Sequence, residues 1–231
     1  DEDPAVCPRL LSEAALACHE SLLQKAEQDG ARKFATTLTL FLGLWPHAYL
    51  LQVGDSRCYI YKDDALTQIS RDQTLAEELV ENGTLSRTAA ESSRWANVLS
   101  SAIGGSEAAP VVTRVVRDWG TIVLLCSDGL TKHVDDEGIA RRMATMTSSR
   151  QLAELLLEDA LDGGGTDNIN FLSGFPAQNN NPDPDLSDFY IVTDPSLGGA
   201  AGAWAMRVPS ILWPRGCWSS ASAGPRESSS T

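Results

Sequence analysis

The sequence has few basic residues and no uninterrupted long apolar run, and each shortage excludes a class of function. Lys and Arg number 18 against 31 Asp and Glu, for a formal net charge of −13. Nucleic acid and anionic membrane surfaces would therefore be repelled over roughly 10 Å. No basic-then-apolar leader opens the sequence, and Arg207 and Pro209 interrupt the apolar stretch 197–213, so we expect no spanning helix. A phosphate-bearing substrate would need bound metal or a local basic patch.

Cysteine and histidine are also scarce and scattered. The five cysteines are odd in number and contain no Cys-x-x-Cys pair, which predicts neither a zinc site nor a disulfide framework. A reducing compartment fits this pattern, so we expect a cytoplasmic protein. Of the three histidines, His19, His47 and His133, surface or helix-end roles are expected. His133 is also near enough to Asp128 in sequence to support the site or contact a substrate.

Apolar periodicity predicts helices over 11–28, 74–82 and 151–161, with a further helix starting near Asp135. Apolar runs predict strands at 35–42, 49–53, 58–61, 111–116, 121–126 and 169–175. We expect the first three strands to form an antiparallel meander. Asn170, Ser173 and Gly174 interrupt the last strand, which favours a frayed or edge position.

The composition changes after Pro176 to an Asn- and Pro-rich segment, followed by a mixture of Gly, Ala, Trp and Ser without helical or strand period. We therefore predict a folded domain over 1–175 and a linker with a largely disordered tail over 176–231.

Three aspartates each stand beside an apolar, strand-like run: Asp55, Asp128 and Asp167. If those strands lie side by side, three carboxylates meet at one rim, and such a cluster is stable only with cations between them. Oxygen ligands without a histidine or cysteine cluster suit hard cations such as Mg²⁺ and Mn²⁺. Taken singly, each motif is better explained as an ordinary turn than as a metal ligand.

Six motifs follow one another in a fixed order: ATTL (35–38), VGDSR (53–57), QISRDQT (68–74), WANVL with AIG (95–104), LLCSDGL (124–130) and GGTDNI (164–169). In this order they resemble the metal-dependent protein serine/threonine phosphatases of the PPM (type 2C) family, in their bacterial form. Gln73 stands where a histidine is common in that family. The resemblance covers residues from about Leu11 to about Leu172.

The resemblance implies an α+β fold, a four-layer α-β-β-α sandwich of two antiparallel sheets flanked by helices. It also implies a centre of two Mn²⁺ or Mg²⁺ ions with Asp128 and Asp167 as ligands, and a third ion held by Asp55 and Asp128. Gly129 and Asn168 would shape the turns. The reaction implied is hydrolysis of phosphoserine and phosphothreonine in proteins by a water that the two metals activate. The partners implied are phosphorylated proteins, with a serine/threonine kinase and its substrates.

Two readings of Arg57 stay open: a contact to incoming phosphate, or a structural ion pair, which we favour.

The family's first metal motif, an Asp-Gly-x-Gly-Gly turn with a metal-bridging aspartate, is not found in the sequence. We therefore expect an N-terminally truncated phosphatase domain with impaired metal binding. The alternatives are a non-catalytic, phosphatase-like module that binds a regulatory partner, and a cation-binding domain without phosphate chemistry.

Overall fold

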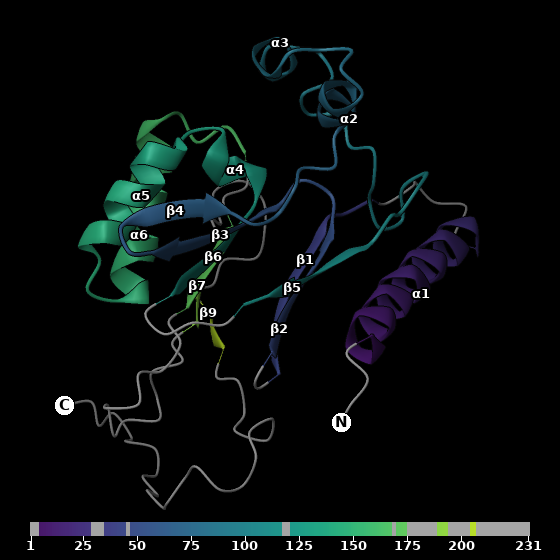
Figure 1. The fold of residues 1–231 in the computed structure, drawn as a ribbon, viewed down its shortest axis with the longest axis horizontal. Coiled ribbons are helices and arrows are strands. Elements are labelled where there is room, and N and C mark those ends of the chain that lie inside the picture. Colours follow the sequence, from purple (N-terminus) through teal and green to yellow (C-terminus); the bar gives the residue numbers. More distant parts are fainter. Residues whose placement is uncertain are drawn as a thin grey trace, which may run out of the picture.

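Two antiparallel sheets form the centre of the protein in the computed structural model, which describes residues 5–28, 35–44, 47–116, 121–167, 170–174, 189–193 and 204–206 (Figure 1). One sheet has the strand order β1-β2-β5, and the other has the order β4-β3-β6-β7-β8-β9. The strands are β1 (Leu38–Leu44), β2 (His47–Val53), β3 (Arg57–Lys62), β4 (Ala65–Gln68), β5 (Val111–Val115), β6 (Ile122–Cys126), β7 (Asn170–Gly174), β8 (Phe189–Thr193) and β9 (Trp204–Met206). The helices are α1 (Val6–Gln28), α2 (Leu75–Glu81), α3 (Arg87–Glu91), α4 (Asp128–Thr131), α5 (Asp136–Thr145) and α6 (Ser149–Asp162).

The side chains of β2 show why the layers stack. Successive residues of a strand point to opposite faces, and here both faces are buried. Leu50 joins an apolar cluster with Cys58 of the second sheet, whereas Leu51 joins a cluster with Ala15 of α1. The near-continuous apolar run of β2 is thus explained by burial on both sides.

A third cluster lies on the outer face of the six-stranded sheet. It joins Tyr59 of β3 and Leu124 of β6 to Ile139 of α5 and Leu156 of α6, all four at 0% exposure. Figure 1 shows α1 beside the three-stranded sheet and α5 and α6 beside the six-stranded sheet. The predicted α+β sandwich with helices outside two antiparallel sheets is confirmed.

Side-chain caps fix where several helices begin. Thr74, Ser86, Asp135 and Ser148 each accept a hydrogen bond from a backbone amide in the first turn of the helix that follows. The predicted helices 74–82 and 151–161 and the helix start near Asp135 correspond to α2, α6 and α5. Helix α3 was not predicted, because its five residues are too short for a periodic signal. Within the described residues, none of the helices has the length and apolarity needed to cross a bilayer.

The predicted meander of the first three strands is wrong. Strand β2 pairs with β1 on one side and with β5 on the other, so neither edge of β2 is left for β3. Strand β3 pairs instead with β4 and β6 in the second sheet. The bend after Val53, where Gly54 has a φ of +107°, takes the chain from one sheet to the other. Strand β4 was not predicted, because its four residues carry a weak apolar signal.

The last predicted strand is also differently placed. Strand β7 lies between β6 and β8, so it is not an edge strand. The strands β8 and β9 fall within 176–231, for which the composition predicts a linker and a largely disordered tail. The run of aromatic and β-branched residues in β8 was the signal available for it. The remaining residues of 176–231 lie outside the described part, and the domain boundary at 175 stays a prediction.

Candidate metal centre

Asp128 and Asp167 meet at one ammonium group. Asp128 is the first residue of α4, directly after β6, and Asp167 lies in the turn that precedes β7. Lys132 Nζ lies 2.6 Å from Asp128 Oδ2 and 2.7 Å from Asp167 Oδ2. Two carboxylates from distant parts of the sequence therefore face the same point, which a cation fills.

Asp55 lies two residues after β2 ends and within electrostatic reach of Asp128. Burial raises the pKa of the Asp55 carboxyl above its ordinary value, and the charge of Asp128 raises that pKa further. The charge of Lys132 acts in the opposite direction. The charges of Asp128 and Lys132 therefore both act on Asp55, and its place as a third metal ligand stays a prediction.

The bend that carries Asp55 is built around Gly54. A Cβ at Gly54 would lie 2.4 Å from Thr37 Cγ2, so that position tolerates no side chain. The Gly54 amide donates to Gln73 Oε1 at 2.7 Å, and the Gln73 amide donates to the Gly54 carbonyl at 3.1 Å. Gln52 Nε2 also donates to the Gly54 carbonyl at 3.1 Å. Two buried glutamines thus hold the backbone next to Asp55.

His133 holds the turn that carries Asp167. Its Nε2 accepts from the Thr166 amide at 3.1 Å and lies 3.0 Å from Thr166 Oγ1, while Nδ1 lies 3.0 Å from the Gly163 carbonyl. With Nε2 as acceptor, Nδ1 carries the hydrogen and donates to that carbonyl. The imidazole ties the end of α4 to both ends of the turn 163–166, so His133 positions Asp167 relative to Asp128.

Arg57 forms a structural ion pair. Its guanidinium donates to Asp72 from Nε and Nη2, with Nη2 at 2.7 Å from Asp72 Oδ2. Arg57 Nη1 also donates to Tyr59 Oη at 3.0 Å, and Tyr59 Oη donates to Asp136 Oδ1 at 2.9 Å. The pair with Asp72 raises the pKa of Arg57 although burial opposes it. This network connects β3 to the loop after β4 and to the start of α5.

The remaining predicted residues are Gly129 and Asn168. Gly129 is buried inside α4, next to Asp128. Asn168 lies outside the described residues. No sequence pattern indicates the positioning role of Gln52, Gln73 stands out only as a departure from the family, and Lys132 was not among the predicted site residues. The Asp128 to Lys132 spacing of four residues, which pairs charges on a helix, was the signal for Lys132.

The carboxylate ligands Asp128 and Asp167 suit a hard cation, but they are few. Asp128 and Asp167 already share one positive group, and carboxylate oxygens are the ligands that Mg²⁺ and Mn²⁺ prefer. Among the described residues, no group of three or more acidic, histidine or cysteine side chains is close enough to hold a metal ion. The pair Asp128 and Asp167 therefore fits a divalent ion as two of its ligands.

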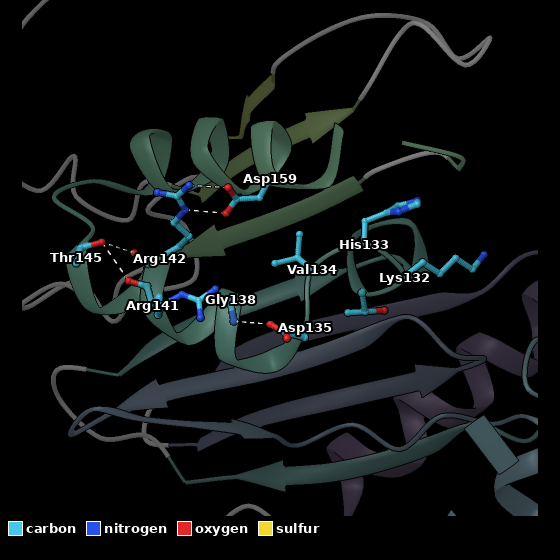
Figure 2. A pocket seen from close by; sticks show the side chains of 10 residues that line it. Lys132, His133, Val134, Asp135, Gly138, Arg141, Arg142, Thr145 and Asp159 are labelled. Carbon is cyan, nitrogen blue, oxygen red and sulfur yellow. Dashed lines mark hydrogen bonds and ion pairs between the residues drawn. The ribbon is translucent and has the colours of Figure 1, made fainter. Parts of the chain in front are cut away.

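A hollow of about 680 Å³ lies next to Lys132, between α4, α5 and α6 (Figure 2). Arg142 donates to both carboxylate oxygens of Asp159 across it, from Nε at 2.7 Å and from Nη2 at 2.5 Å. Figure 2 shows Lys132 extending away from Arg141 and Arg142. The hollow thus opens beside the rim, and the ammonium group of Lys132 points out of it.

Comparison with known proteins identifies the family to which the chain is similar. The protein phosphatase 2C family matches residues 4–162. The chain is 35% identical over 166 residues to the serine/threonine protein phosphatase PstP of Mycobacterium tuberculosis, in an alignment that covers 71% of this chain and 30% of that protein. It is 31% identical over 152 residues to a serine/threonine phosphatase of Listeria innocua, covering 65% of this chain and 60% of that protein. The chain thus spans less than two thirds of the length of these relatives.

Solved structures agree with the sequence match. The catalytic domain of PstP in complex with two manganese ions superposes with a TM-score of 0.64 at 32% identity, covering 75% of this chain and 72% of that one. The phosphatase MsPP of Mycobacterium smegmatis, in complex with cacodylate, gives a TM-score of 0.59 at 28% identity, covering 67% and 69%. From its sequence and its fold alike, this chain belongs to the protein phosphatase 2C family.

Proposed function

We propose that this chain hydrolyses phosphoserine and phosphothreonine in proteins with the help of Mn²⁺ or Mg²⁺. The observation that carries the proposal is the shared cation position between Asp128 and Asp167, in a chain whose family match runs over residues 4–162. We assign Asp128 and Asp167 as metal ligands, and Asp55 with Asp128 as the place for a further ion. Gly129, Asn168 and Arg57 support the turns and the rim.

The charge of the protein explains why cations are needed. At a net charge of −13, the protein repels a phosphorylated substrate unless positive charge stands at the site. Divalent cations, when bound, make a water more acidic and offset the charge of the phosphate oxygens. Asp128 and Asp167 hold such cations, while Gln73 and His133 keep the turns of Asp55 and Asp167 in place. The products are the free hydroxyl and inorganic phosphate.

We also propose the substrates of this protein and its cellular compartment. The substrates are proteins that a serine/threonine kinase has phosphorylated, because the relatives are serine/threonine phosphatases by name. The compartment is the cytoplasm. Cys58 and Cys126 are free, buried thiols, which supports a reducing compartment. Residues 1–175 would be the phosphatase domain, and β8 and β9 extend its second sheet beyond that boundary.

Phosphate release from a phosphothreonine peptide in the presence of Mn²⁺ tests the proposal on the full chain. We expect release by the parent protein and a fall of at least about 10- to 100-fold for Asp128→Asn and for Asp167→Asn, since losses around a metal site reach that size even for residues that only support the ligands. Glu137→Gln is the matched control, because Glu137 is an exposed carboxylate of α5 paired with Arg141.

Two outcomes would contradict the proposal. Equal phosphate release from the parent and both aspartate variants would show that Asp128 and Asp167 are not metal ligands. Mn²⁺ binding by calorimetry without any release from serine or threonine phosphopeptides would instead support the non-catalytic phosphatase-like module.

A further inference from the structure

Lys132 stands where the proposed function needs a metal ion. Its ammonium lies 2.6 Å from Asp128 Oδ2 and 2.7 Å from Asp167 Oδ2, which are ion-pair distances to both assigned ligands. A divalent cation that used these two oxygens would have to enter the same space. The ammonium and the metal cannot both occupy it, since two positive groups would lie within a few ångströms of each other.

From this geometry we propose that Lys132 is an internal competitor of the metal. Without metal, its ammonium neutralises Asp128 and Asp167 and holds them together, and metal binding requires that the side chain swing out. Lys132 therefore sets the metal affinity of the site and keeps it low. This inference rests on the proposed function only for the assignment of Asp128 and Asp167 as ligands.

The backbone of Lys132 stays in place while its side chain is able to leave. The Lys132 amide donates to the Asp128 carbonyl at 2.9 Å, so α4 fixes the backbone one turn from Asp128. The side chain of Lys132 is 32% exposed, and its flexible four-carbon stem gives the ammonium a path to water. The carboxylates are similarly open, at 37% for Asp128 and 40% for Asp167, so an ion from solvent reaches them.

The charge of Lys132 also acts on Asp55, where it partly offsets the repulsion from Asp128. When the ammonium leaves, Asp128 and Asp167 lose their shared counter-charge. A cation with two charges then compensates the rim better than the single charge of lysine, which is why metal is able to win the competition.

Calorimetry of Mn²⁺ binding to the full chain tests the competition directly. Lys132→Met keeps the length and the apolar stem of the side chain but removes the charge. We expect it to bind Mn²⁺ about 3- to 30-fold more tightly than the parent, because two partly exposed ion pairs no longer have to be broken. In the absence of metal the same variant is expected to melt at a lower temperature, and saturating Mn²⁺ should raise its melting temperature more than that of the parent.

Two further variants serve as controls. Lys132→Arg retains a cation at the pair and is expected to keep the affinity close to that of the parent. Arg141→Gln changes the net charge by the same amount as Lys132→Met but removes an exposed cation that pairs with Glu137 one turn away on α5. If general charge were responsible, Arg141→Gln would tighten Mn²⁺ binding as much as Lys132→Met.

The outcomes separate this inference from the proposed function. Unchanged or weaker Mn²⁺ binding by Lys132→Met, or an equal gain in Arg141→Gln, would overturn the inference while leaving the hydrolysis assay unaffected. Tighter binding by Lys132→Met without phosphopeptide hydrolysis would support the inference and count against the proposed function. Absence of Mn²⁺ binding in every variant would overturn both.

Discussion

Gln73 Oε1 accepts a hydrogen bond of 2.7 Å from the backbone amide of Gly54, the residue that precedes Asp55. The other end of the same side chain, Nε2, donates to the Ala109 carbonyl at 2.9 Å. Gln73 is 8% exposed, so both ends lie away from water. One side chain thus satisfies two backbone groups and connects the Asp55 bend to the segment that enters β5.

We predict that Gln73→Leu lowers the free energy of unfolding by about 1–3 kcal/mol, because the buried Gly54 amide loses its hydrogen-bond acceptor. Chemical denaturation of the metal-free chain measures this change. Gln24→Leu, on an exposed position of α1, is the control and should leave stability nearly unchanged. A Gln73→Leu protein as stable as the parent would mean that water or another polar group replaces the lost hydrogen bonds.

Gly54→Ala separates backbone conformation from packing. Gly54 has a φ of +107° and would place a Cβ at 2.4 Å from Thr37 Cγ2, whereas Gly83 has a φ of +71° and nothing within 4 Å of its Cβ position. A residue other than glycine in such conformations costs on the order of 1–3 kcal/mol. We expect Gly83→Ala to show that cost alone and Gly54→Ala to be distinctly worse in the same denaturation experiment. Equal losses in the two variants would show that the chain at Gly54 shifts to avoid Thr37.

His133→Ala is expected to weaken Mn²⁺ binding more than it weakens the fold. The imidazole joins Gly163 and Thr166 across the turn that leads to Asp167, so its loss leaves that ligand poorly positioned. Loss of such a supporting residue costs about 10- to 100-fold in metal affinity. Calorimetry gives the affinity, and circular dichroism shows that the fold is retained.

His47→Ala is the control for His133→Ala. His47 lies at the start of β2 with its Nδ1 2.8 Å from Arg114 Nη2, and its removal should leave Mn²⁺ affinity unchanged. Equal affinities for the parent and His133→Ala would show that the turn 163–166 keeps its shape without the imidazole.

The ion pair between α5 and α6 predicts a pH-dependent stability. The hydrogen bonds from Arg142 hold the pKa of the Asp159 carboxyl below its ordinary value of 3.8. A carboxyl with a lowered pKa in the folded state stabilises the fold above its ordinary pKa, and this contribution is lost as the pH falls through the lowered value. Arg142→Gln should therefore lower the melting temperature at neutral pH, and the gap to the parent should shrink below about pH 3.8.

Melting curves recorded from neutral to acid pH check this prediction. Arg150→Gln, which removes an exposed cation 2.8 Å from Glu154 within α6, controls for the change in net charge. A gap between Arg142→Gln and the parent that stays constant down to the acid end would assign the loss to packing of the Arg142 side chain and not to the ion pair.

Apolar periodicity and the residues at helix ends were sufficient to predict most of the helices. The apolar period of 11–28 predicted α1, which begins five residues earlier at Val6, and the acidic cluster after Asp135 predicted the start of α5. The buried runs of β2 and β6 were likewise visible, because strands buried on both faces need apolar residues at nearly every position. The order of the motifs identified the family and, with it, the two-sheet sandwich.

Which strands pair with one another could not be predicted from such local signals. Whether β3 continues the first sheet or starts the second depends on the ladder that β5 forms with β2, more than fifty residues later in the chain. Hydrogen bonding along a strand edge is open to any partner of suitable length, so local sequence does not select the neighbour. The meander prediction failed for this reason, and so did the edge position predicted for β7.

The residues of the site also fall into two groups, those predicted from the sequence and those that only the structure shows. The sequence by itself determined which residues could be ligands, because carboxylates next to strand ends are recognisable from residue type and spacing: Asp55, Asp128 and Asp167. Only the tertiary structure decided which groups surround them. Lys132 joins two of the carboxylates, and Gln73 and His133 hold the two turns through contacts with residues 19 to 33 positions away. Apart from the four-residue spacing of Asp128 and Lys132 on α4, these contacts depend on how the sheets and helices pack, which no local pattern encodes.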